Sequence, residues 1–273
     1  MIYIEILAQR METLVKEGVC IAFSGGADSA LLLKMASLAK EKIMKETKKL
    51  PVVVALTFDT ALHPKTDLVA AKKLTEEFQV EHVIFSINEL DNEVILQNPV
   101  DRCYHCKKYL FETVKTFAKE REISHIIDGT NFDDLSEYRP GLLALKELQI
   151  ESPLAEAEIT KEKVREQLKK LGLAVAKRPS APCLATRIPY DTKIDLELLA
   201  QIDKGEQYLQ SIGFLVNRIR VHGLIARIEI EKSQFALFLQ KQEEITQVLH
   251  DLNFTYITLD LEGFRSGSMD IHL

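Results

Sequence analysis

The chain has 273 residues, of which 46% are hydrophobic and 28% charged, as is usual for a soluble globular protein with one large domain and room for a smaller one. A net charge of −6 at pH 7 disfavours a broad nucleic-acid-binding surface, which needs clustered lysine and arginine. No apolar run approaches the roughly 20 residues that span a membrane, and no secretory signal opens the chain, so we expect a cytoplasmic protein without membrane contact.

Helical and extended patterns alternate through the first part of the chain. The predicted helices lie near residues 4–17, 28–48, 65–78 and 104–121, and the predicted strands near residues 19–23, 51–58, 82–87 and 124–130. This alternation is typical of the α/β class with an open, mostly parallel, doubly wound sheet. Because such sheets bind ligands at the carboxyl ends of their strands, we expect the loops at 24–29, 57–59 and 128–131 to converge on one crevice.

The stretch Ser24-Gly25-Gly26-Ala27-Asp28-Ser29 lies between the first predicted strand and the helix that follows it. Glycine has no Cβ, so its backbone can turn sharply and approach a ligand closely. Hydroxyl groups and the amide groups at a helix N-terminus are donors suited to phosphate. In this setting the motif resembles the PP-loop of ATP pyrophosphatases, which cut ATP between its α- and β-phosphates, rather than a structural turn.

The pattern changes after a helix predicted near residues 160–171. Three prolines and three basic residues between Lys177 and Pro189 predict an ordered loop that acts as a hinge. A helix near 196–212, a hairpin over 216–222 and 226–230, a helical stretch near 233–252 and a strand near 256–261 follow. We therefore predict two domains, a large one over residues 1–185 and a smaller α+β domain over residues 186–273.

The chain has four cysteines, and their surroundings differ. Cys20 lies in an apolar strand and is expected to be part of the core. Cys103 and Cys106 form a C-x-x-C, and Cys183 lies in the proline-rich hinge. In a reducing compartment metal and catalytic roles gain weight over disulfides. The spacing alone leaves open a redox pair, a zinc knuckle, unlinked thiols, or a four-iron, four-sulfur cluster held by three thiolates.

Charged side chains supply the remaining candidate sites. Asp128 ends a predicted strand and suits Mg²⁺ or ribose binding, although it could also cap its loop. By period-two counting, one face of the hairpin carries Arg218, Arg220, Arg227 and Glu229. Arginine binds phosphate bidentately and keeps its charge, so these residues predict a phosphate site, the alternative being a solvated face with local ion pairs.

Together the motifs resemble the LarE family, which consists of PP-loop ATP-dependent sulfur transferases of nickel-pincer nucleotide cofactor biosynthesis. The resemblance covers almost the full chain. It rests on residues 23–29, Asp128-Gly129, Tyr138-Arg139-Pro140-Gly141, residues 185–190, Arg218-Ile219-Arg220, Ala226-Arg227-Ile228-Glu229 and residues 259–267. It implies a PP-loop fold of the HUP-like, adenine nucleotide alpha hydrolase-like kind with a smaller C-terminal domain.

The resemblance also implies the reaction. ATP adenylylates a carboxylate of a pyridinium biscarboxylate mononucleotide and releases pyrophosphate, and sulfur then displaces AMP to leave a thiocarboxylate. In one branch of the family a single cysteine, at the position of Cys183, gives up its own sulfur. In the other branch three cysteines hold an iron–sulfur cluster that carries a transferable sulfide. This chain has Cys103, Cys106 and Cys183, so it resembles the cluster branch, with ATP, Mg²⁺ and a 4Fe-4S cluster as its cofactors.

The family's functional residues map onto this chain in three groups. The residues expected to bind ATP and Mg²⁺ are Ser24, Gly25, Gly26, Asp28, Ser29, Asp128, Gly129 and Arg139. The residues expected to take part in catalysis are Asp28 and the three cysteines, which are also the expected metal ligands. The residues expected to hold the phosphate of the substrate are Arg187, Glu206, Arg218, Arg220 and Arg227.

Other interpretations remain open from the sequence. A PP-loop tRNA thiolation enzyme also adenylylates its substrate and also uses cysteines or a cluster, but the acidic net charge disfavours it. An amidating PP-loop ligase would not need three thiols, and a non-catalytic iron–sulfur carrier would not need the ATP loop. The expected partners are a small nucleotide substrate and a sulfur donor, and the family implies a homo-oligomer.

Overall fold

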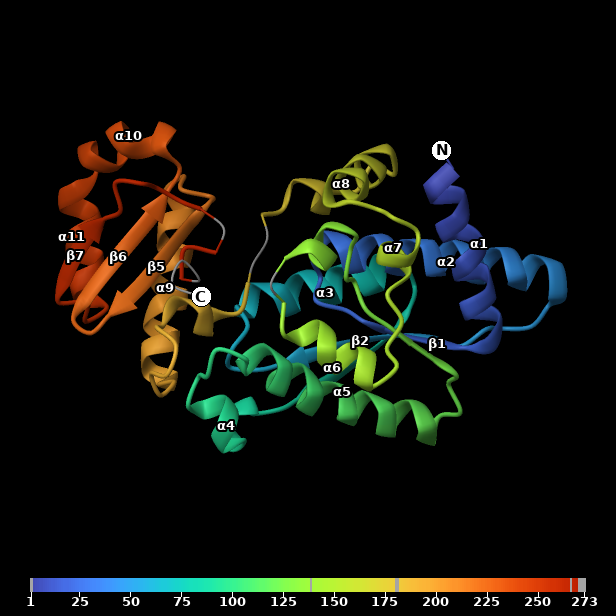
Figure 1. Ribbon diagram of the computed structural model, residues 1–273. Helices are drawn as coiled ribbons and strands as arrows, with labels where there is room; N and C mark the ends of the chain where they lie inside the picture. Colours follow the sequence, from blue (N-terminus) through green and yellow to red (C-terminus); the bar gives the residue numbers. More distant parts are fainter. Residues whose placement is uncertain (1, 138, 180–181, 266, 270–273) are drawn as a thin grey trace. The chain divides into compact units, whose positions relative to one another are not determined.

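The computed structural model describes residues 2–137, 139–179, 182–265 and 267–269 (Figure 1). Contacts divide the chain into two compact units. The first consists of Met1–Thr60, Lys65–Glu89 and Asp101–Ala181, and the second of Ala61–Pro64, Leu90–Val100 and Pro182–Leu273. The division into domains at residue 185 stays a prediction about regions that fold independently.

A four-stranded parallel sheet forms the centre of the first unit, and its strand order is β3-β2-β1-β4. The strands are β1 (Val19–Ala22), β2 (Val53–Asp59), β3 (Glu81–Ser86) and β4 (His125–Ile127). Val19 of β1 pairs with Val53 of β2 on one side and with His125 of β4 on the other. The strand order therefore reverses at β1, which is where open α/β sheets bind their ligands. The predicted α/β class with a parallel sheet is confirmed.

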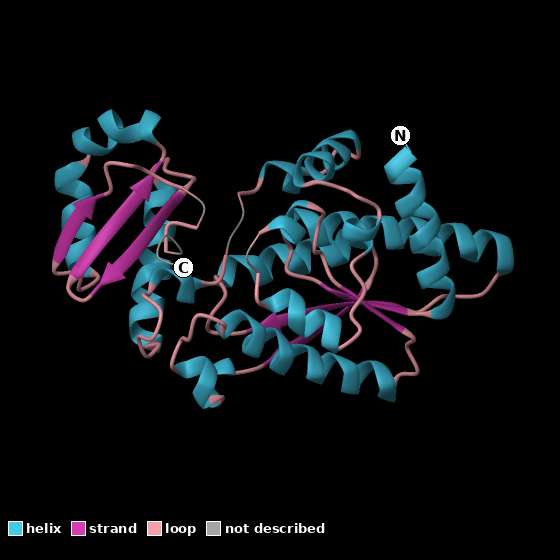
Figure 2. Ribbon diagram, viewed as in Figure 1, coloured by secondary structure: helices cyan, strands magenta, loops and turns pink. Residues whose placement is uncertain are grey.

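Helices cover both faces of this sheet (Figures 1 and 2). They are α1 (Ile2–Glu17), α2 (Ala27–Thr47), α3 (Lys65–Glu77), α5 (Arg102–Glu120), α6 (Gly141–Glu147), α7 (Pro153–Glu156) and α8 (Lys161–Lys170), with short 3-10 turns at η1 (Glu89–Asp91), η2 (Asp133–Ser136) and η3 (Ala174–Lys177). In Figure 1, α1, α2 and α8 lie on one side of the strands and α5 and α6 on the other. The sequence analysis did not predict α6 and α7, which are short.

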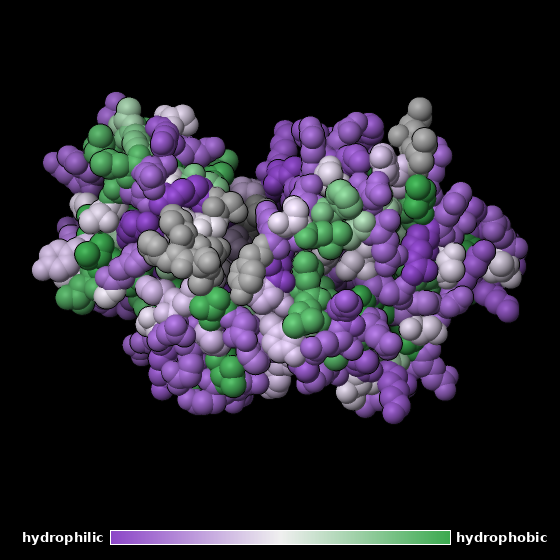
Figure 3. Space-filling model, viewed as in Figure 1, coloured by the Kyte–Doolittle hydropathy of each residue, from purple (hydrophilic) through white to green (hydrophobic). Residues whose placement is uncertain are grey.

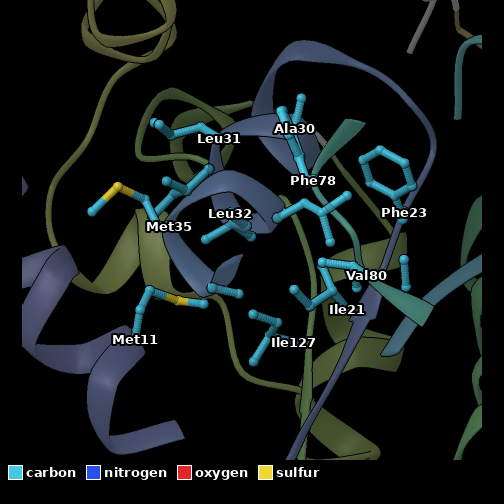
Figure 4. Packing of buried hydrophobic residues seen from close by; sticks show 14 of the residues in the cluster. Met11, Ile21, Phe23, Ala30, Leu31, Leu32, Met35, Phe78, Val80 and Ile127 are labelled. Atoms are coloured by element: carbon cyan, nitrogen blue, oxygen red, sulfur yellow. The ribbon is translucent and has the colours of Figure 1, made fainter. Parts of the chain in front are cut away.

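A large hydrophobic cluster of the first unit lies on the side of the sheet that α1 and α2 cover. Met11 of α1 and Leu32 and Met35 of α2 gather with Ile21 of β1 and Ile127 of β4 (Figure 4). Their burial takes apolar surface out of water, which is the main favourable term in folding. The alternation of side chains along β1 fixes which residues face this core.

Cys20 faces the opposite side of the sheet from Ile21, because successive side chains of a strand point to opposite faces. It is fully buried and belongs to the cluster that contains Val114 and Ala118 of α5. Burial raises the pKa of the Cys20 thiol to about 12. The prediction that Cys20 is a core residue is confirmed.

The second unit contains a three-stranded sheet of order β5-β6-β7, in which β5 and β6 are antiparallel and β6 and β7 parallel. Its elements are α4 (Glu93–Leu96), η4 (Leu184–Arg187), α9 (Leu196–Ser211), β5 (Asn217–His222), β6 (Ile225–Ile230), η5 (Lys232–Gln234), α10 (Phe235–Gln240), α11 (Gln242–Asp251) and β7 (Tyr256–Leu259). The stretch predicted near 233–252 is helical, as expected, and consists of η5, α10 and α11. It is broken at Lys241, whose φ of −100° and ψ of 8° interrupt the helical backbone.

Helix α9 approaches the small sheet closely at Gly205. A Cβ built on Gly205 would lie 2.6 Å from Cδ1 of Ile219 on β5 and 3.2 Å from Cδ2 of Leu249 on α11. A larger residue would therefore require the Ile219 side chain to move.

Figure 3 shows the face seen in Figure 1 as mostly hydrophilic with scattered apolar residues. Across the described part of the chain, no helix has both the length and the apolar character needed to cross a membrane.

Candidate functional site

The PP-loop motif connects β1 to α2, as the sequence predicts. Gly25 has a φ of +70°, and a Cβ on it would lie 2.9 Å from the backbone nitrogen of Ala71 and 3.0 Å from the carbonyl oxygen of Asp67. Only glycine fits this conformation next to the backbone of α3. Gly26 is the N-cap of α2, and no side-chain hydrogen bond caps the helix there. The first amide groups of α2 are therefore suited to an anion such as phosphate.

Two hydroxyl groups lie over this turn. Ser24 Oγ accepts a hydrogen bond from Gly26 N at 3.3 Å and lies 3.3 Å from Ser29 Oγ. Ser29 Oγ is also placed to donate to the Gly26 carbonyl at 3.3 Å. The motif thus concentrates hydroxyl and amide donors within one turn of chain, as a phosphate cradle requires.

Asp28 forms an ion pair with Lys161. Lys161 is the first residue of α8, and its backbone nitrogen donates to Asp133 Oδ2 at 2.8 Å. The second carboxylate oxygen of Asp28, Oδ1, is buried and has no hydrogen-bond partner among the described residues. An unsatisfied carboxylate oxygen beside a phosphate-binding turn suits Mg²⁺, which prefers oxygen ligands. The residues present therefore fit a magnesium–ATP complex.

Asp128 lies directly after β4 and is held from several sides. Thr130 Oγ1 donates to its Oδ2 at 2.6 Å, Ser152 Oγ donates to its Oδ1 at 2.7 Å, and Lys107 Nζ lies 3.4 Å from Oδ2. Next to it, a Cβ on Gly129 would lie 3.1 Å from the backbone nitrogen of Ser29. The structure therefore brings the loop after β4 against the PP-loop.

Two arginines near this loop differ in their contacts. Arg139, expected at the ATP site, is exposed and pairs with Asp134 at 2.8 Å and with Glu137 at 2.9 Å. Arg178, which the sequence analysis did not select, donates from Nη1 to the Gly25 carbonyl at 3.0 Å and also pairs with Asp67 of α3. The sequence around Arg178 has no motif that indicates a contact with the PP-loop. A lone arginine in a proline-rich loop can have many roles, so the sequence analysis did not select it.

Cys103 and Cys106 lie in the first turn of α5, three residues apart. Cys103 is exposed, and Cys106 is half-buried. Arg102 Nη2 lies 3.6 Å from Cys103 Sγ, and Cys106 Sγ lies 3.9 Å from Oε1 of Glu89. Burial raises the pKa of the fully buried Glu89 to about 6. Cysteine sulfurs are the ligands that zinc sites and iron–sulfur clusters use in proteins.

Cys183 belongs to the second unit, whereas Cys103 and Cys106 belong to the first. Within the residues that the structure describes, no three His, Cys, Asp or Glu side chains gather as a metal site. The donor chemistry of the three thiols fits an iron–sulfur cluster, because all three are at least partly exposed, unlike Cys20. That the three thiols meet stays a prediction.

The loop around Cys183 is tied to α9 by a buried ion pair. Arg187 Nε and Nη2 donate to the two carboxylate oxygens of Glu206 at 2.9 and 2.8 Å. Arg187 Nη1 lies 3.1 Å from the carbonyl oxygen of Cys183. Glu206 Oε1 in turn accepts the backbone nitrogen of Ile219 at 2.9 Å. Arg187 and Glu206, both expected to bind substrate phosphate, are therefore joined to each other.

The hairpin register places the polar residues on one face, as the period-two pattern predicts. Arg218 pairs across the strands with Glu229, and Arg220 with Arg227. The face is buried rather than solvated. Arg220 Nη2 lies 3.1 Å from Glu229 Oε2, and Arg227 Nη2 lies 3.2 Å from Glu229 Oε1. Burial, followed by repulsion from Arg187, lowers the pKa of Arg218 to about 10. Such a concentration of guanidinium groups suits an anionic ligand.

The segment after β7 covers this face. The ring of Phe264 lies 5.2 Å from the guanidinium of Arg218, a cation–π distance. Ser268 Oγ donates to Glu229 Oε1 at 2.5 Å, and the carboxylate of Asp260 lies 3.1 Å from Arg227 and 3.2 Å from Arg265. Tyr138 and Ser266 of the family motifs fall outside the described residues.

Comparison with known proteins gives no match to a family model. An uncharacterized protein of Synechocystis sp. is 36% identical over 252 residues, which cover 92% of this chain and 91% of that protein. The pyridinium-3,5-bisthiocarboxylic acid mononucleotide synthase of Lactiplantibacillus plantarum is 33% identical over 271 residues, 97% of this chain and 95% of that protein. The 7-cyano-7-deazaguanine synthase of Clostridium novyi is 30% identical over 138 residues, 45% of this chain and 58% of that protein.

The partial similarity to a 7-cyano-7-deazaguanine synthase indicates the PP-loop superfamily, in agreement with the parallel sheet and the loop after β1. The similarity to the mononucleotide synthase extends over nearly the whole of both chains. The chain therefore belongs to the LarE family of PP-loop enzymes.

Proposed function

We propose that the protein is an ATP-dependent, AMP-forming sulfur transferase that converts a carboxylate of a pyridinium biscarboxylate mononucleotide to a thiocarboxylate. The observation that carries the proposal is the similarity to a pyridinium-3,5-bisthiocarboxylic acid mononucleotide synthase over 97% of the chain. A carboxylate is a poor electrophile because neither of its oxygens leaves readily. Attack of its oxygen on the α-phosphorus of ATP releases pyrophosphate and makes AMP a leaving group.

In this proposal the first unit activates the substrate. The amide and hydroxyl groups of the PP-loop bind the phosphates, and Asp28, with one buried oxygen left without a hydrogen bond, is the ligand for Mg²⁺. When bound, Mg²⁺ would neutralise charge that develops on the phosphates. Asp128, held by Thr130 and Ser152, is preorganised to bind the nucleotide. Lys161 would balance the charge of Asp28 before ATP enters.

In this proposal the three thiols hold the group that supplies the sulfur. Cys103, Cys106 and Cys183 would hold a 4Fe-4S cluster, which would supply a transferable sulfide. A sulfur nucleophile that adds to the carbonyl carbon of the acyl adenylate would displace AMP, which would leave with the electron pair of the broken C–O bond. An enzyme of this kind keeps its cysteines and completes many turnovers.

The phosphate of the mononucleotide would bind on the second unit. Arg218 and Arg227 lie on one face of the hairpin and are largely buried, so their charges act where water screens them little. Arg220 lies on the same face, but its three guanidinium nitrogens already bond Glu229 and the Thr186 carbonyl. A mononucleotide carries one phosphate, which two guanidinium groups can bind bidentately.

The proposal is tested with protein purified without oxygen, on which iron, acid-labile sulfide and visible absorption are measured before and after Cys183→Ala. Iron and absorption that are lost in the variant would support the cluster, and colourless wild-type protein after reconstitution would contradict it. Pyrophosphate release that depends on the pyridinium mononucleotide supports the proposed substrate. Release that depends on tRNA instead would identify a tRNA thiolation enzyme.

A further inference from the structure

The guanidinium of Arg187 is surrounded by acceptors from its own chain. Besides its two bonds to Glu206, Nη1 lies 3.0 Å from the Pro182 carbonyl, 3.1 Å from the Cys183 carbonyl and 2.9 Å from Thr186 Oγ1. The side chain of Arg187 is 1% exposed. All three guanidinium nitrogens are thus engaged inside the protein, and none faces solvent, where it could meet a substrate phosphate.

Glu206 continues this connection into the small sheet. Its Oε1 accepts the backbone nitrogen of Ile219 at 2.9 Å, and its own carbonyl accepts Asn217 Nδ2 at 3.3 Å. A continuous chain of hydrogen bonds therefore runs from β5 through Glu206 and Arg187 to the main chain at Cys183. A buried ion pair of this kind adds little to stability compared with apolar residues of the same size, so its presence points to a specific geometric role.

Two further hydrogen bonds fix the same loop at the residues that follow Cys183. Leu184 N donates to the Leu62 carbonyl at 2.8 Å, and Arg220 Nη1 donates to the Thr186 carbonyl at 2.8 Å. The Cys183 side chain, in contrast, is only half-buried. The loop is thus built to hold its backbone rigid while a reagent can still reach the thiol.

We infer that Arg187, together with Glu206, is a positioning residue that fixes the main chain at Cys183 so that the thiol keeps one orientation for sulfur transfer. This inference rests on the proposed function for the role of Cys183, and it removes Arg187 and Glu206 from the residues that would bind substrate phosphate. A reacting group that is held in the productive geometry reacts faster than one that samples many geometries. The Arg187–Glu206 ion pair provides this advantage by holding the backbone at Cys183.

The first test measures the rate at which iodoacetamide alkylates Cys183 in metal-free protein, by mass spectrometry of its peptides, with Cys103 as the internal reference. Arg187→Met is expected to raise the Cys183 rate about tenfold, the factor that corresponds to a 1.4 kcal/mol change in the equilibrium between fixed and open loop. Arg187→Lys should give an intermediate rate, because an ammonium keeps the charge but cannot pair bidentately with Glu206. An unchanged Cys183 rate in Arg187→Met overturns the inference.

The matched control is Arg165→Lys. Arg165 also holds two backbone carbonyls, those of Ala176 at 3.3 Å and Arg178 at 3.2 Å, but it does so in the first unit. Its variant should leave the Cys183 rate at the wild-type value. If Arg187→Met does not fold, Glu206→Gln serves instead, since its amide oxygen can still accept from Ile219 while the ion pair is lost.

The second test separates positioning from binding. Arg187→Lys should lower kcat for thiocarboxylate formation about tenfold and leave KM for the mononucleotide within about twofold, as for an interaction that acts only in the transition state. A raised KM with an unchanged kcat and an unchanged Cys183 alkylation rate would make Arg187 a substrate ligand and overturn the inference. If the wild-type protein forms no thiocarboxylate, the proposed function fails, and the alkylation rates still decide whether Arg187 positions Cys183.

Discussion

Ser152 Oγ donates a 2.7 Å hydrogen bond to Oδ1 of Asp128, although the two residues lie 24 positions apart. Ser152 is the residue before α7, and Asp128 is the residue after β4. The backbone supports the same approach, because Asp128 N donates to the Glu151 carbonyl at 2.9 Å. The carboxylate is therefore oriented by a neighbouring segment and not only by its own loop.

Ser152→Ala is expected to weaken ATP binding. The substitution removes a donor to a charged carboxylate, a bond that contributes about 1.5 kcal/mol or more, so KM for ATP should rise about tenfold in a pyrophosphate-release assay. Ser211→Ala is the control, because Ser211 Oγ donates to the Tyr208 carbonyl at an exposed position of α9. An equal rise in both variants, or none in Ser152→Ala, would contradict a role for Ser152 in holding Asp128.

Gly25→Ala should damage the PP-loop far more than a glycine substitution elsewhere. Alanine at a φ of +70° is strained by roughly 1–2 kcal/mol, and its Cβ would also press on the backbone of Ala71 and Asp67 in α3. Overpacking of this kind typically adds about 1–3 kcal/mol. We expect a lower midpoint of thermal unfolding and loss of ATP-dependent pyrophosphate release.

Gly172→Ala is a matched control for that prediction. Gly172 has a φ of +73°, but nothing lies within 4 Å of a Cβ built there. Gly172→Ala should therefore be destabilised by the backbone strain alone, and it should keep the pyrophosphate release of the wild-type protein. Equal destabilisation in the two variants would mean that the contact between Gly25 and α3 contributes nothing.

The sequence predicted the residues of the PP-loop and of the loop after β4 better than the residues that contact these loops from distant segments. The PP-loop has a motif of its own, and the rule that parallel strands bind ligands at their carboxyl ends predicted that Asp128 and Gly129 would approach it. Lys161 and Arg178 reach the same loop from more than 130 residues away. A single lysine or arginine has no periodicity or spacing that reveals such a partner, so only the three-dimensional structure identifies it.

The small sheet shows a second reason why the sequence analysis could not predict all of the site. The period-two pattern correctly predicted one polar face for Arg218, Arg220, Arg227 and Glu229. It could not predict that this face is buried, because burial depends on partners outside the hairpin, such as Phe264 and Ser268 in the segment after β7. Helix α9 and η4 likewise supply the two halves of the Arg187–Glu206 pair from separate segments of the chain.

His125 gives the stability of the first unit a dependence on pH. Its Nδ1 lies 2.6 Å from Glu151 Oε1 and its Nε2 lies 2.9 Å from Glu17 Oε2. Burial alone would lower the pKa of His125, but the two carboxylates outweigh it and raise the pKa above the ordinary 6.5. Since the folded pKa exceeds the unfolded one, the stabilisation is complete below pH 6.5 and is lost as the pH rises through the folded pKa.

His125→Gln should therefore be less stable than wild type at pH 5.5 by about 1 kcal/mol or less, as for partly exposed ion pairs, and the difference should shrink by pH 9. Urea unfolding at the two pH values measures it. His250→Gln is the control, because His250 Nδ1 faces the Phe254 carbonyl at 2.9 Å rather than a carboxylate. A difference in the free energy of unfolding between wild type and His125→Gln that is constant or grows with pH would contradict the prediction.

Arg218 offers a direct test of the phosphate site. Its guanidinium lies near those of Arg187 and Arg220, whose charges help to lower its pKa, so an anion that binds there relieves repulsion. Orthophosphate should accordingly raise the midpoint of thermal unfolding of the wild-type protein, by an amount that reflects about 2.7 kcal/mol at a concentration one hundred times Kd. In Arg218→Met the increase should disappear. Arg121→Met is the matched control, since Arg121 also stacks on a phenylalanine, Phe117, at 4.9 Å, but far along the sequence from the hairpin. A phosphate effect that survives in Arg218→Met would show that the anion binds elsewhere.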